Sequence, residues 1–222
     1  MPKKTFFNLP DDKRALICNV AIEEFAAHPF EQVSINRIVA KTNIAKGSFY
    51  QYFENKKDLF FYLMQLAGEA KLSYLTPALQ NPAQHNFFTL LRELYRSGIQ
   101  FAIAYPKLAE IGKKLMMSKD TPILADLIES SMPAAQEFFE PLLQNAINRG
   151  EIRADIDVKL FAYLIASMHT QVVEYYINQV AQEYDETMMS TLDQFIEFLK
   201  QGIGKNEIQD KEHAEVAQSI SG

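Results

Sequence analysis

The chain has 222 residues, of which 48% are hydrophobic and 23% are charged, and its formal net charge is −6. This length suits one or two domains with a substantial core, and no apolar run reaches the length of a membrane span. The first residues lack an apolar core of signal-peptide length, and Cys18 is the only cysteine. We therefore expect a cytoplasmic protein without an internal disulfide, in which Cys18 is a small core residue.

The negative charge is unevenly distributed along the chain. Residues 1–60 hold nine Lys or Arg and seven Asp or Glu, a net of +2, whereas the remainder holds thirteen and twenty-one, a net of −8, and the two give −6. Attraction to phosphate is screened over about 10 Å at moderate salt, so a local basic patch is sufficient for nucleic-acid binding. The cations that could form such a patch are Lys3, Lys4, Arg37, Lys41, Lys46, Lys56 and Lys57. Alone, these would be read as ordinary solvated charges.

Residues 34–56, SINRIVAKTNIAKGSFYQYFENK, are the most informative segment for function. Ile35 and Ile38 lie at helical spacing and would face inward. Ser34 precedes them as an N-cap, and Asn43 tolerates the left-handed conformation that a tight turn requires. The segment therefore predicts two short helices joined by a turn.

The second of these helices has two different faces. Phe49 and Phe53, four residues apart, lie on the inner face. The other face combines a cation, an amide, a phenol and a glycine: Lys46, Gln51, Tyr50 and Gly47. Such a helix fits the major groove of DNA, where amides and cations pair with base edges.

The rest of the chain is helical in pattern, with no strand and no Gly-rich loop. The expected helices cover about 59–75, 87–105, 107–117, 122–148, 157–183 and 186–202. A loop lies between Pro77 and Pro82, and Pro133 and Pro141 predict a break or kink in the fourth of these helices. The fold class is therefore all-α. The polar tail from Lys205 is expected to be mobile.

The last two helices carry apolar arcs that are wider than one neighbouring core requires. Either both helices are central in their own domain, or they form a dimeric four-helix bundle with a second copy. We favour the dimer, because a two-fold protein reads a palindromic site in two successive grooves. The expected interface residues are Phe161, Leu164, Ile165, Val172, Tyr176, Leu192, Phe195, Ile196 and Leu199.

The stretch from Asp12 to about Leu59 resembles the DNA-binding domain of the TetR family of bacterial transcriptional regulators. The strongest match is GSFYQYFENKKDL, with Tyr50, Phe53, Lys56 and Leu59 at the family's positions, preceded by the aromatic residues Phe25 and Phe30. Asn43, Pro29 and Ala45 stand where the family usually has the turn glycine, a glycine after the first helix, and a capping Ser or Thr.

The resemblance implies an N-terminal three-helix helix-turn-helix DNA-binding domain over 1–58, and a C-terminal helical ligand-binding and dimerisation domain over 59–204. The tail is 205–222. In this arrangement Lys46 and Gln51 would read bases, and Lys56, at the head of the fourth helix, would hold a phosphate. The full set of expected DNA contacts is Ser34, Asn36, Arg37, Lys46, Gly47, Ser48, Tyr50, Gln51, Tyr52 and Lys56.

The resemblance also implies a small-molecule receptor in the C-terminal domain, whose ligand binds the conformation that does not bind DNA more tightly. The many aromatic and Met side chains favour a lipophilic inducer. The expected pocket residues are Phe88, Arg92, Tyr95, Phe101, Tyr105, Met116, Met117, Phe138, Met168, His169 and Gln171. For any one of them, plain core packing is the more common explanation.

Two other classes of protein compete with a repressor of palindromic operator DNA. A protein–protein adaptor would explain the apolar arcs, but not the exposed polar face of the second short helix. An enzyme is disfavoured because the four histidines are far apart, and no phosphate loop or nucleophile elbow is present. We expect neither a metal nor a cofactor. The same reading head would also suit an activator.

Overall fold

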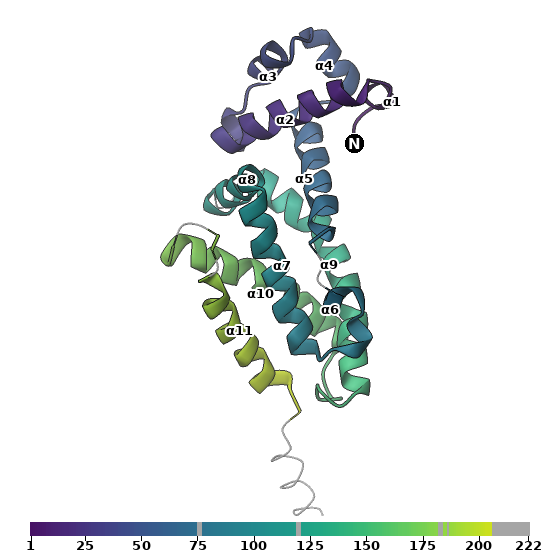
Figure 1. Cartoon of the computed structure of the whole chain (residues 1–222), viewed down its shortest axis with the longest axis vertical. Helices are drawn as coiled ribbons and strands as arrows, with labels where there is room; N and C mark the ends of the chain where they lie inside the picture. The colour runs from purple at the N-terminus through teal and green to yellow at the C-terminus, as the bar shows by residue number, and fades with distance from the viewer. Residues whose placement is uncertain (75–76, 119–120, 182–183, 186, 206–222) are drawn as a thin grey trace, which may run out of the picture. The chain divides into compact units, whose positions relative to one another are not determined.

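The structure is a computed structural model that describes residues 1–74, 77–118, 121–181, 184–185 and 187–205. The described residues form helices and no strand, apart from an isolated antiparallel bridge between Ile152 and Gly204 (Figure 1). The all-α prediction is confirmed. The expected mobile tail lies outside the described residues from residue 206 onward.

The first third of the chain forms five α-helices and a short 3₁₀ helix. They are α1 (Lys4–Phe7), α2 (Asp11–Ala27), η1 (Phe30–Gln32), α3 (Ile35–Thr42), α4 (Lys46–Tyr52) and α5 (Lys56–Leu72). The helix α1 was not expected, because its four residues are too short for a periodic pattern. The other four α-helices were predicted from the sequence.

The remaining helices are α6 (Pro77–Gln80), η2 (Pro82–Gln84), α7 (Phe87–Ala104), α8 (Pro106–Met117), α9 (Pro122–Asn148), α10 (Val158–Gln179) and α11 (Met188–Ile203). The expected loop at residues 77–82 therefore contains a helical turn. The prolines do not break α9, because the helix continues through both Pro133 and Pro141, and the kink stays a prediction. Each proline frees the carbonyl four residues earlier, and these belong to the exposed Glu129 and Glu137, where water can replace the lost bond.

The chain divides into two compact units that do not follow chain order. Unit 1 comprises Met1–Leu75, Arg96–Ser131 and Val173–Glu186, and unit 2 comprises Thr76–Tyr95, Met132–Val172 and Thr187–Gly222. The expected boundary after residue 58 remains a prediction about where a folding domain ends.

The core of unit 1 joins the helices α2, α3, α4, α5 and α8. Its most deeply buried side chains include Phe6, Ile17, Ile38, Phe49 and Phe53, all at 0% exposure. Ile111 and Leu115 of α8 complete the same core, and Cys18 belongs to it as expected. The side chain of Lys57 also pairs with Asp126 at the start of α9 (2.5 Å), and Lys107 of α8 pairs with Glu23 of α2 (2.6 Å).

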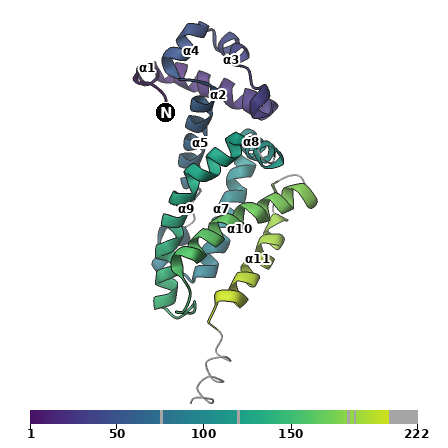
Figure 2. The same cartoon turned by 180° about the vertical axis from the view of Figure 1, so that it is seen from behind.

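In unit 2, the end of α11 is fastened to the segment that precedes α10. The backbone N–H of Arg153 donates to the carbonyl of Ile203 (3.0 Å), and that of Lys205 donates to Glu151 (3.1 Å). Asp157 caps α10 by accepting from the N–H groups of Lys159 and Leu160. The part of α10 that belongs to unit 2 and α11 lie next to each other in the two opposite views (Figures 1 and 2).

Candidate nucleic-acid interface

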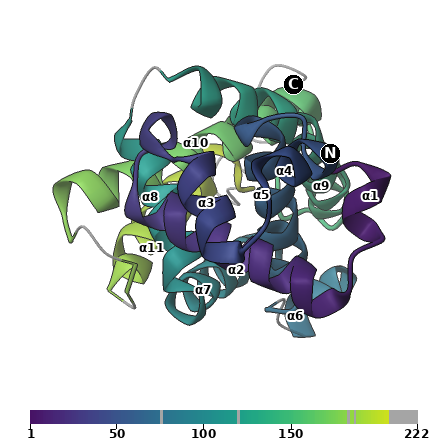
Figure 3. The ribbon, with the colours of Figure 1, turned by 90° about the horizontal axis from the view of Figure 1, so that it is seen from above.

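The turn between α3 and α4 is built from local backbone chemistry. The Ser34 hydroxyl oxygen accepts from the Arg37 N–H (3.4 Å), which caps α3 as predicted. Asn43 adopts the left-handed conformation, with φ 50° and ψ 49°, and is the only described residue other than glycine with positive φ. Asn accepts this conformation at low cost, so the chain can reverse sharply between the two helices. The turn is visible from above in Figure 3.

Buried polar contacts fix the orientation of α3 on α2. The Glu24 carboxylate is 2% exposed and accepts from Arg37 Nε (2.7 Å) and from the backbone N–H of Ser34 (3.1 Å). Burial alone would raise the pKa of Glu24, but these hydrogen bonds and the Arg37 charge lower it overall. At the other end of α3, the Lys13 ammonium donates to the carbonyl of Thr42 (2.7 Å).

The helix α4 presents the two faces that the sequence predicts. Phe49 and Phe53 are fully buried, and their rings lie 5.5 Å apart in the core of unit 1. Lys46, Gly47, Tyr50 and Gln51 are exposed. Among the described residues, the side chains of Lys46 and Gln51 have no hydrogen-bond or ion-pair partner within their own subunit. This face is therefore available to an external ligand.

Gly47 leaves open space on that face. A Cβ atom built on Gly47 would meet no described heavy atom within 4 Å outside its own helix turn and neighbours. The glycine is therefore not required by packing inside the subunit. Its place at the first turn of α4 is consistent with the close approach of another molecule.

The other residues expected to contact DNA fall into two groups. Asn36 is exposed on α3, Ser34 is half-buried at the N-cap of α3, and Ser48 and Tyr52 are half-buried on α4. Arg37 is different, because it pairs with Glu24 and its Nη2 also donates to the carbonyl of Gln32 (2.8 Å). Its guanidinium holds α3 to α2, so we no longer expect it to read bases.

The expected phosphate contact by Lys56 is not supported by the geometry. Its ammonium donates to the carbonyls of Phe30 (2.6 Å), Glu31 (3.1 Å) and Val33 (3.1 Å), and it lies 4.7 Å from the centre of the Phe30 ring. A lysine has three N–H donors, and here each has an acceptor. Burial lowers the pKa of this ammonium. Lys56 therefore fastens η1 to α5.

The first turn of α5 is also occupied by its own side chains. Asn55 accepts from the N–H of Asp58 (2.9 Å), and the Asp58 carboxylate accepts from the N–H of Glu54 (3.1 Å). This arrangement differs from a capping box in one respect, because Asp58 accepts from the residue before the N-cap and not from Asn55 itself. The spacing of Asn55 and Asp58 could have revealed the N-cap in the sequence. The Asp58 carboxylate also pairs with the N-terminal ammonium of Met1.

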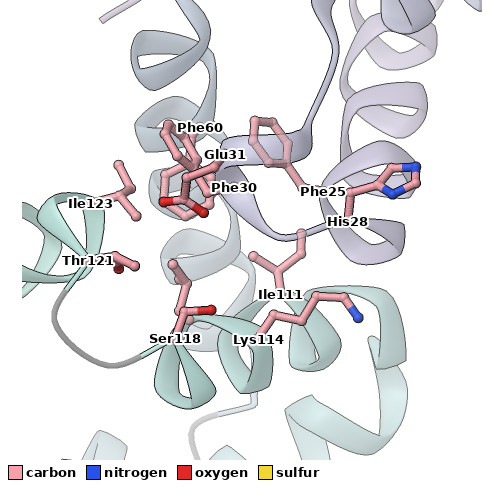
Figure 4. A pocket seen from close by; sticks show the side chains of 11 residues that line it. Phe25, His28, Phe30, Glu31, Phe60, Ile111, Lys114, Ser118, Thr121 and Ile123 are labelled. Atoms are coloured by element: carbon pink, nitrogen blue, oxygen red, sulfur yellow. The ribbon is translucent and has the colours of Figure 1, made fainter.

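A small cavity lies in unit 1 between the helix-turn-helix and α8. Its volume of about 10 Å³ is comparable to the space of one water molecule. It is lined by residues of α2, η1, α5, α8 and the start of α9, including Phe25, Phe30, Ile111 and Thr121 (Figure 4). None of the expected ligand-binding residues lines it, so it is not the pocket that the sequence predicts.

The expected ligand residues are divided between the two units. Phe88, Arg92, Tyr95, Phe138, Met168, His169 and Gln171 belong to unit 2, and Phe101, Tyr105, Met116 and Met117 belong to unit 1. In unit 2 the structure stacks Tyr95 on His169, with ring centres 5.0 Å apart. Arg92 is bound to Asp193 by two hydrogen bonds (2.7 and 3.0 Å).

Several of the other expected pocket residues are not interior. The exposed fractions are 40% for Tyr105, 58% for Met117 and 43% for Phe138, and Gln171 is also exposed. Helical periodicity identified these positions as apolar or amphipathic but did not show which side of each helix the chain covers. We no longer expect these four to line an interior pocket.

Most of the expected dimer residues are covered by their own subunit. Ile165, Tyr176, Leu192, Phe195, Ile196 and Leu199 are between 0% and 8% exposed. Phe195, for example, packs against Tyr95 of α7, with ring centres 6.3 Å apart. They are core residues, as in the alternative that the sequence left open. Phe161, Leu164 and Val172 remain half-buried.

Different apolar side chains of α10 and α11 face outward in unit 2. Leu160 is 49% exposed, Tyr163 is 47% exposed and Phe198 is 62% exposed. Large exposed apolar side chains on neighbouring helices indicate an interaction surface. The sequence pattern missed these three residues because apolar spacing along a helix does not show which side the rest of the chain covers.

A helix-turn-helix with an exposed reading face, at the head of an all-helical chain, defines a DNA-binding transcription regulator. The model of bacterial regulatory proteins of the tetR family matches residues 17–63. A TetR family transcriptional regulator from Chloroflexus aurantiacus J-10-FL is 33% identical, with a TM-score of 0.65, and the match covers 93% of this chain and all of that one. The chain therefore belongs to the TetR family, which is a family of transcription regulators and not of enzymes.

Two further proteins are similar to most of the chain. The probable acrEF/envCD operon repressor of Escherichia coli (strain K12) is 25% identical over 187 residues, which cover 82% of this chain and 83% of the repressor. FadR from Bacillus subtilis, solved in complex with stearoyl-CoA, is 20% identical with a TM-score of 0.66, over 85% of this chain and 98% of FadR. The second likeness shows a shared fold.

Among the described helices, none has both the length and the apolar character that crossing a lipid bilayer requires.

Proposed function

We propose that this chain is a dimeric repressor that binds palindromic operator DNA through α4 and is released by a small lipophilic ligand. The observation that carries the proposal is the open face of α4, defined by Lys46, Gly47, Tyr50 and Gln51. It rests on the buried Phe49 and Phe53, so its orientation is fixed by the core. A TetR family regulator with such a face has the chemistry to read base edges.

The proposed contacts follow from side-chain type and exposure. Lys46 donates to guanine, and Gln51 makes two hydrogen bonds with adenine. Tyr50, Tyr52, Ser48 and Ser34 contact the phosphate backbone, with Asn36 as a secondary base contact. Lys56 and Arg37 are excluded from the set, because Lys56 donates to three carbonyls of its own subunit and the Arg37 guanidinium is paired with Glu24.

Lys46→Ala tests the reading face. We expect it to weaken binding to the DNA that flanks the protein's own gene by about 1–3 kcal/mol, and to relax preference at particular base pairs. Fluorescence anisotropy on operator and scrambled duplexes measures both effects. The control is Lys159→Ala, which removes the same charge from an exposed position in unit 2. Equal losses for both variants would show that only net charge matters and would refute the reading role.

The dimer surface is proposed on unit 2, where α10 and α11 expose Leu160, Tyr163 and Phe198. The double variant Tyr163→Glu and Phe198→Glu should give monomers in sedimentation experiments and should abolish high-affinity binding to a full palindrome. The control is Met117→Glu, at an exposed apolar position of α8. A variant that remains dimeric would exclude this surface.

Hydroxyl groups that lack partners inside unit 2 support a ligand site there. The Tyr95 hydroxyl, in a residue that is 4% exposed, and the Ser167 hydroxyl have no hydrogen-bond partner among the described residues. Leaving such groups unpaired costs on the order of 1–3 kcal/mol each, so interior hydroxyls normally have partners. A bound ligand would supply them.

The head group of the ligand is proposed to be acidic. The FadR relative holds stearoyl-CoA, an acidic amphiphile. The apolar chain of such a lipophilic acid would suit the aromatic interior of unit 2.

Release of labelled operator by stearoyl-CoA, stearate and octadecanol tests the ligand proposal. We expect the two acids to release DNA at lower concentration than the alcohol. Tyr95→Phe should weaken the response while leaving DNA affinity unchanged, whereas Tyr175→Phe, at an exposed tyrosine, should change neither. If none of the three compounds releases DNA from the wild-type protein, this ligand class is wrong.

A further inference from the structure

The C-terminal end of α4 is held by the first residues of the chain. The last carbonyls of any helix lack partners within that helix. Here the backbone N–H of Lys3 donates to the carbonyl of Tyr52 (2.8 Å), and the Lys3 ammonium donates to that of Tyr50 (2.9 Å). The Thr5 hydroxyl donates to the carbonyl of Gln51. Three consecutive carbonyls of α4 are therefore occupied by Lys3 and Thr5.

The donors at Lys3 and Thr5 are positioned by a buried aromatic anchor. Phe6 is fully buried, and its ring lies 4.8 Å from that of Phe53 and 5.5 Å from that of Tyr62. The Arg14 guanidinium also donates to the carbonyl of Phe7 (2.7 Å), which ties the end of α1 to α2. The segment is thus part of the fold of unit 1, and Figure 3 shows α1 and α4 in the same region of that unit.

The helix α4 needs this support more than most helices do. It has seven residues, and a helix this short is marginal on its own. Its N-cap position is Ala45, which makes no side-chain capping bond. Both ends of a helix normally require such partners. Because α4 has no side-chain cap at its N-terminal end, its stability depends more on the contacts at its C-terminal end.

We propose that Lys3 and Thr5 are positioning residues for DNA recognition, which act by holding the last turn of α4 in its reading orientation. This inference rests on the proposed role of α4 in DNA binding. Both residues precede residues 17–63, which the family model matches. The last turn of α4 includes Tyr50 and Gln51, so a small rotation there moves two of the proposed contacts at once.

The competing role for Lys3 is a direct phosphate contact from a basic N-terminal arm. The two roles differ in salt dependence. A phosphate contact contributes about one unit to the slope of log affinity against log salt, for every DNA sequence. A positioning residue changes affinity for the operator and leaves the slope unchanged, because no counterion is released at it.

Lys3→Met is the test, with Lys4→Met as its matched control. Lys4 is an adjacent exposed lysine whose side chain has no partner among the described residues. We expect Lys3→Met to weaken operator binding on the order of tenfold, from loss of a charge-assisted hydrogen bond. Its salt slope and its affinity for scrambled DNA should match wild type, and Lys4→Met should show little change. Lys3→Arg should restore operator binding, because it keeps the donor.

Thr5→Val provides a second, uncharged test of the same contact. It keeps the side-chain shape and removes the donor to Gln51, so we expect weaker operator binding together with faster hydrogen exchange in the last turn of α4. Thermal melting confirms that each variant is folded at the assay temperature. A fall in salt slope of about one unit for Lys3→Met would overturn the proposal in favour of a phosphate contact. Wild-type operator binding by both Lys3→Met and Thr5→Val would also overturn it. If Lys46→Ala bound operator normally as well, the reading role of α4 itself would be wrong.

Discussion

The helices α4 and α5 each begin with a lysine, ten residues apart, and the two ammonium groups lie in opposite surroundings. The Lys46 ammonium has no partner among the described residues, whereas the Lys56 ammonium is surrounded by three carbonyl oxygens. Both stand at the head of a helix, where anions are favoured. Residue type and helix position are the same for the two lysines, and only the tertiary contacts of their donors distinguish them.

The largest expected effect comes from removing the Lys56 side-chain donors. Lys56→Met leaves three carbonyls of residues 30–33 without that partner, and we expect a loss of about 2 kcal/mol in the free energy of unfolding. Urea denaturation measures it. Lys46→Met, at the unpartnered lysine, should change stability by less than about 0.5 kcal/mol.

The same pair of variants separates the two roles on DNA. Under conditions where both proteins are folded, Lys56→Met should keep the wild-type salt slope, because the Lys56 ammonium already donates to three carbonyls of its own subunit. If the salt slope of Lys56→Met fell by about one unit with stability unchanged, Lys56 would be a phosphate contact. Its hydrogen bonds to the carbonyls of Phe30, Glu31 and Val33 would then break when DNA binds.

A second comparison concerns the adjacent glutamates of α2. Glu24 is buried and paired with Arg37, whereas Glu23 is on the exposed side and pairs with Lys107. Glu24→Gln should cost about 1–2 kcal/mol of stability at neutral pH, because it weakens the charge-assisted bonds that hold α3. Glu23→Gln should change stability little, since exposed ion pairs contribute little.

The contribution of the Glu24 carboxylate to stability should also depend on pH. The pKa of Glu24 is lowered in the folded state, so its carboxylate stabilises the fold above its ordinary pKa of about 4.3. This stability is lost as the pH falls through the lowered value. Unfolding experiments between about pH 5 and pH 3 should therefore show a steeper loss for wild type than for Glu24→Gln. Parallel curves would show that the Glu24–Arg37 pair is not coupled to folding.

The sequence predicted those features of the interface that depend on local chemistry. Ser34 caps α3, Asn43 takes the left-handed turn, and Phe49 and Phe53 face inward, since each follows from residue type and spacing over a few positions. The carbonyl partners of Lys56 were not predicted, because they lie 23 to 26 residues earlier in the chain. No local pattern encodes such a contact.

The interior of the C-terminal part was less predictable, for a related reason. Periodicity found that Phe195 and Phe198 lie on an apolar helix, but it could not show which side α7 covers. Phe195 packs beneath that helix, whereas Phe198 is 62% exposed. Patterns of apolar residues therefore identify helices and their wide faces, and the choice between core and interface requires the tertiary structure.

The smallest expected effect on stability comes from Gly47→Ala, and it is the most selective test of the α4 face. Alanine is favoured over glycine in a helix by up to about 1 kcal/mol, and the added Cβ meets no described heavy atom within 4 Å. We therefore expect the free protein to become slightly more stable, by about 0.5 kcal/mol. Operator binding should become weaker if DNA approaches α4 at this point, because the methyl group then occupies the contact. On the same preparation, urea denaturation measures the expected gain in stability and fluorescence anisotropy measures the expected loss of operator affinity. Gain of stability with unchanged operator affinity would place the DNA surface closer to Gln51 than to Gly47, and it would limit the reading face to the last turn of the helix.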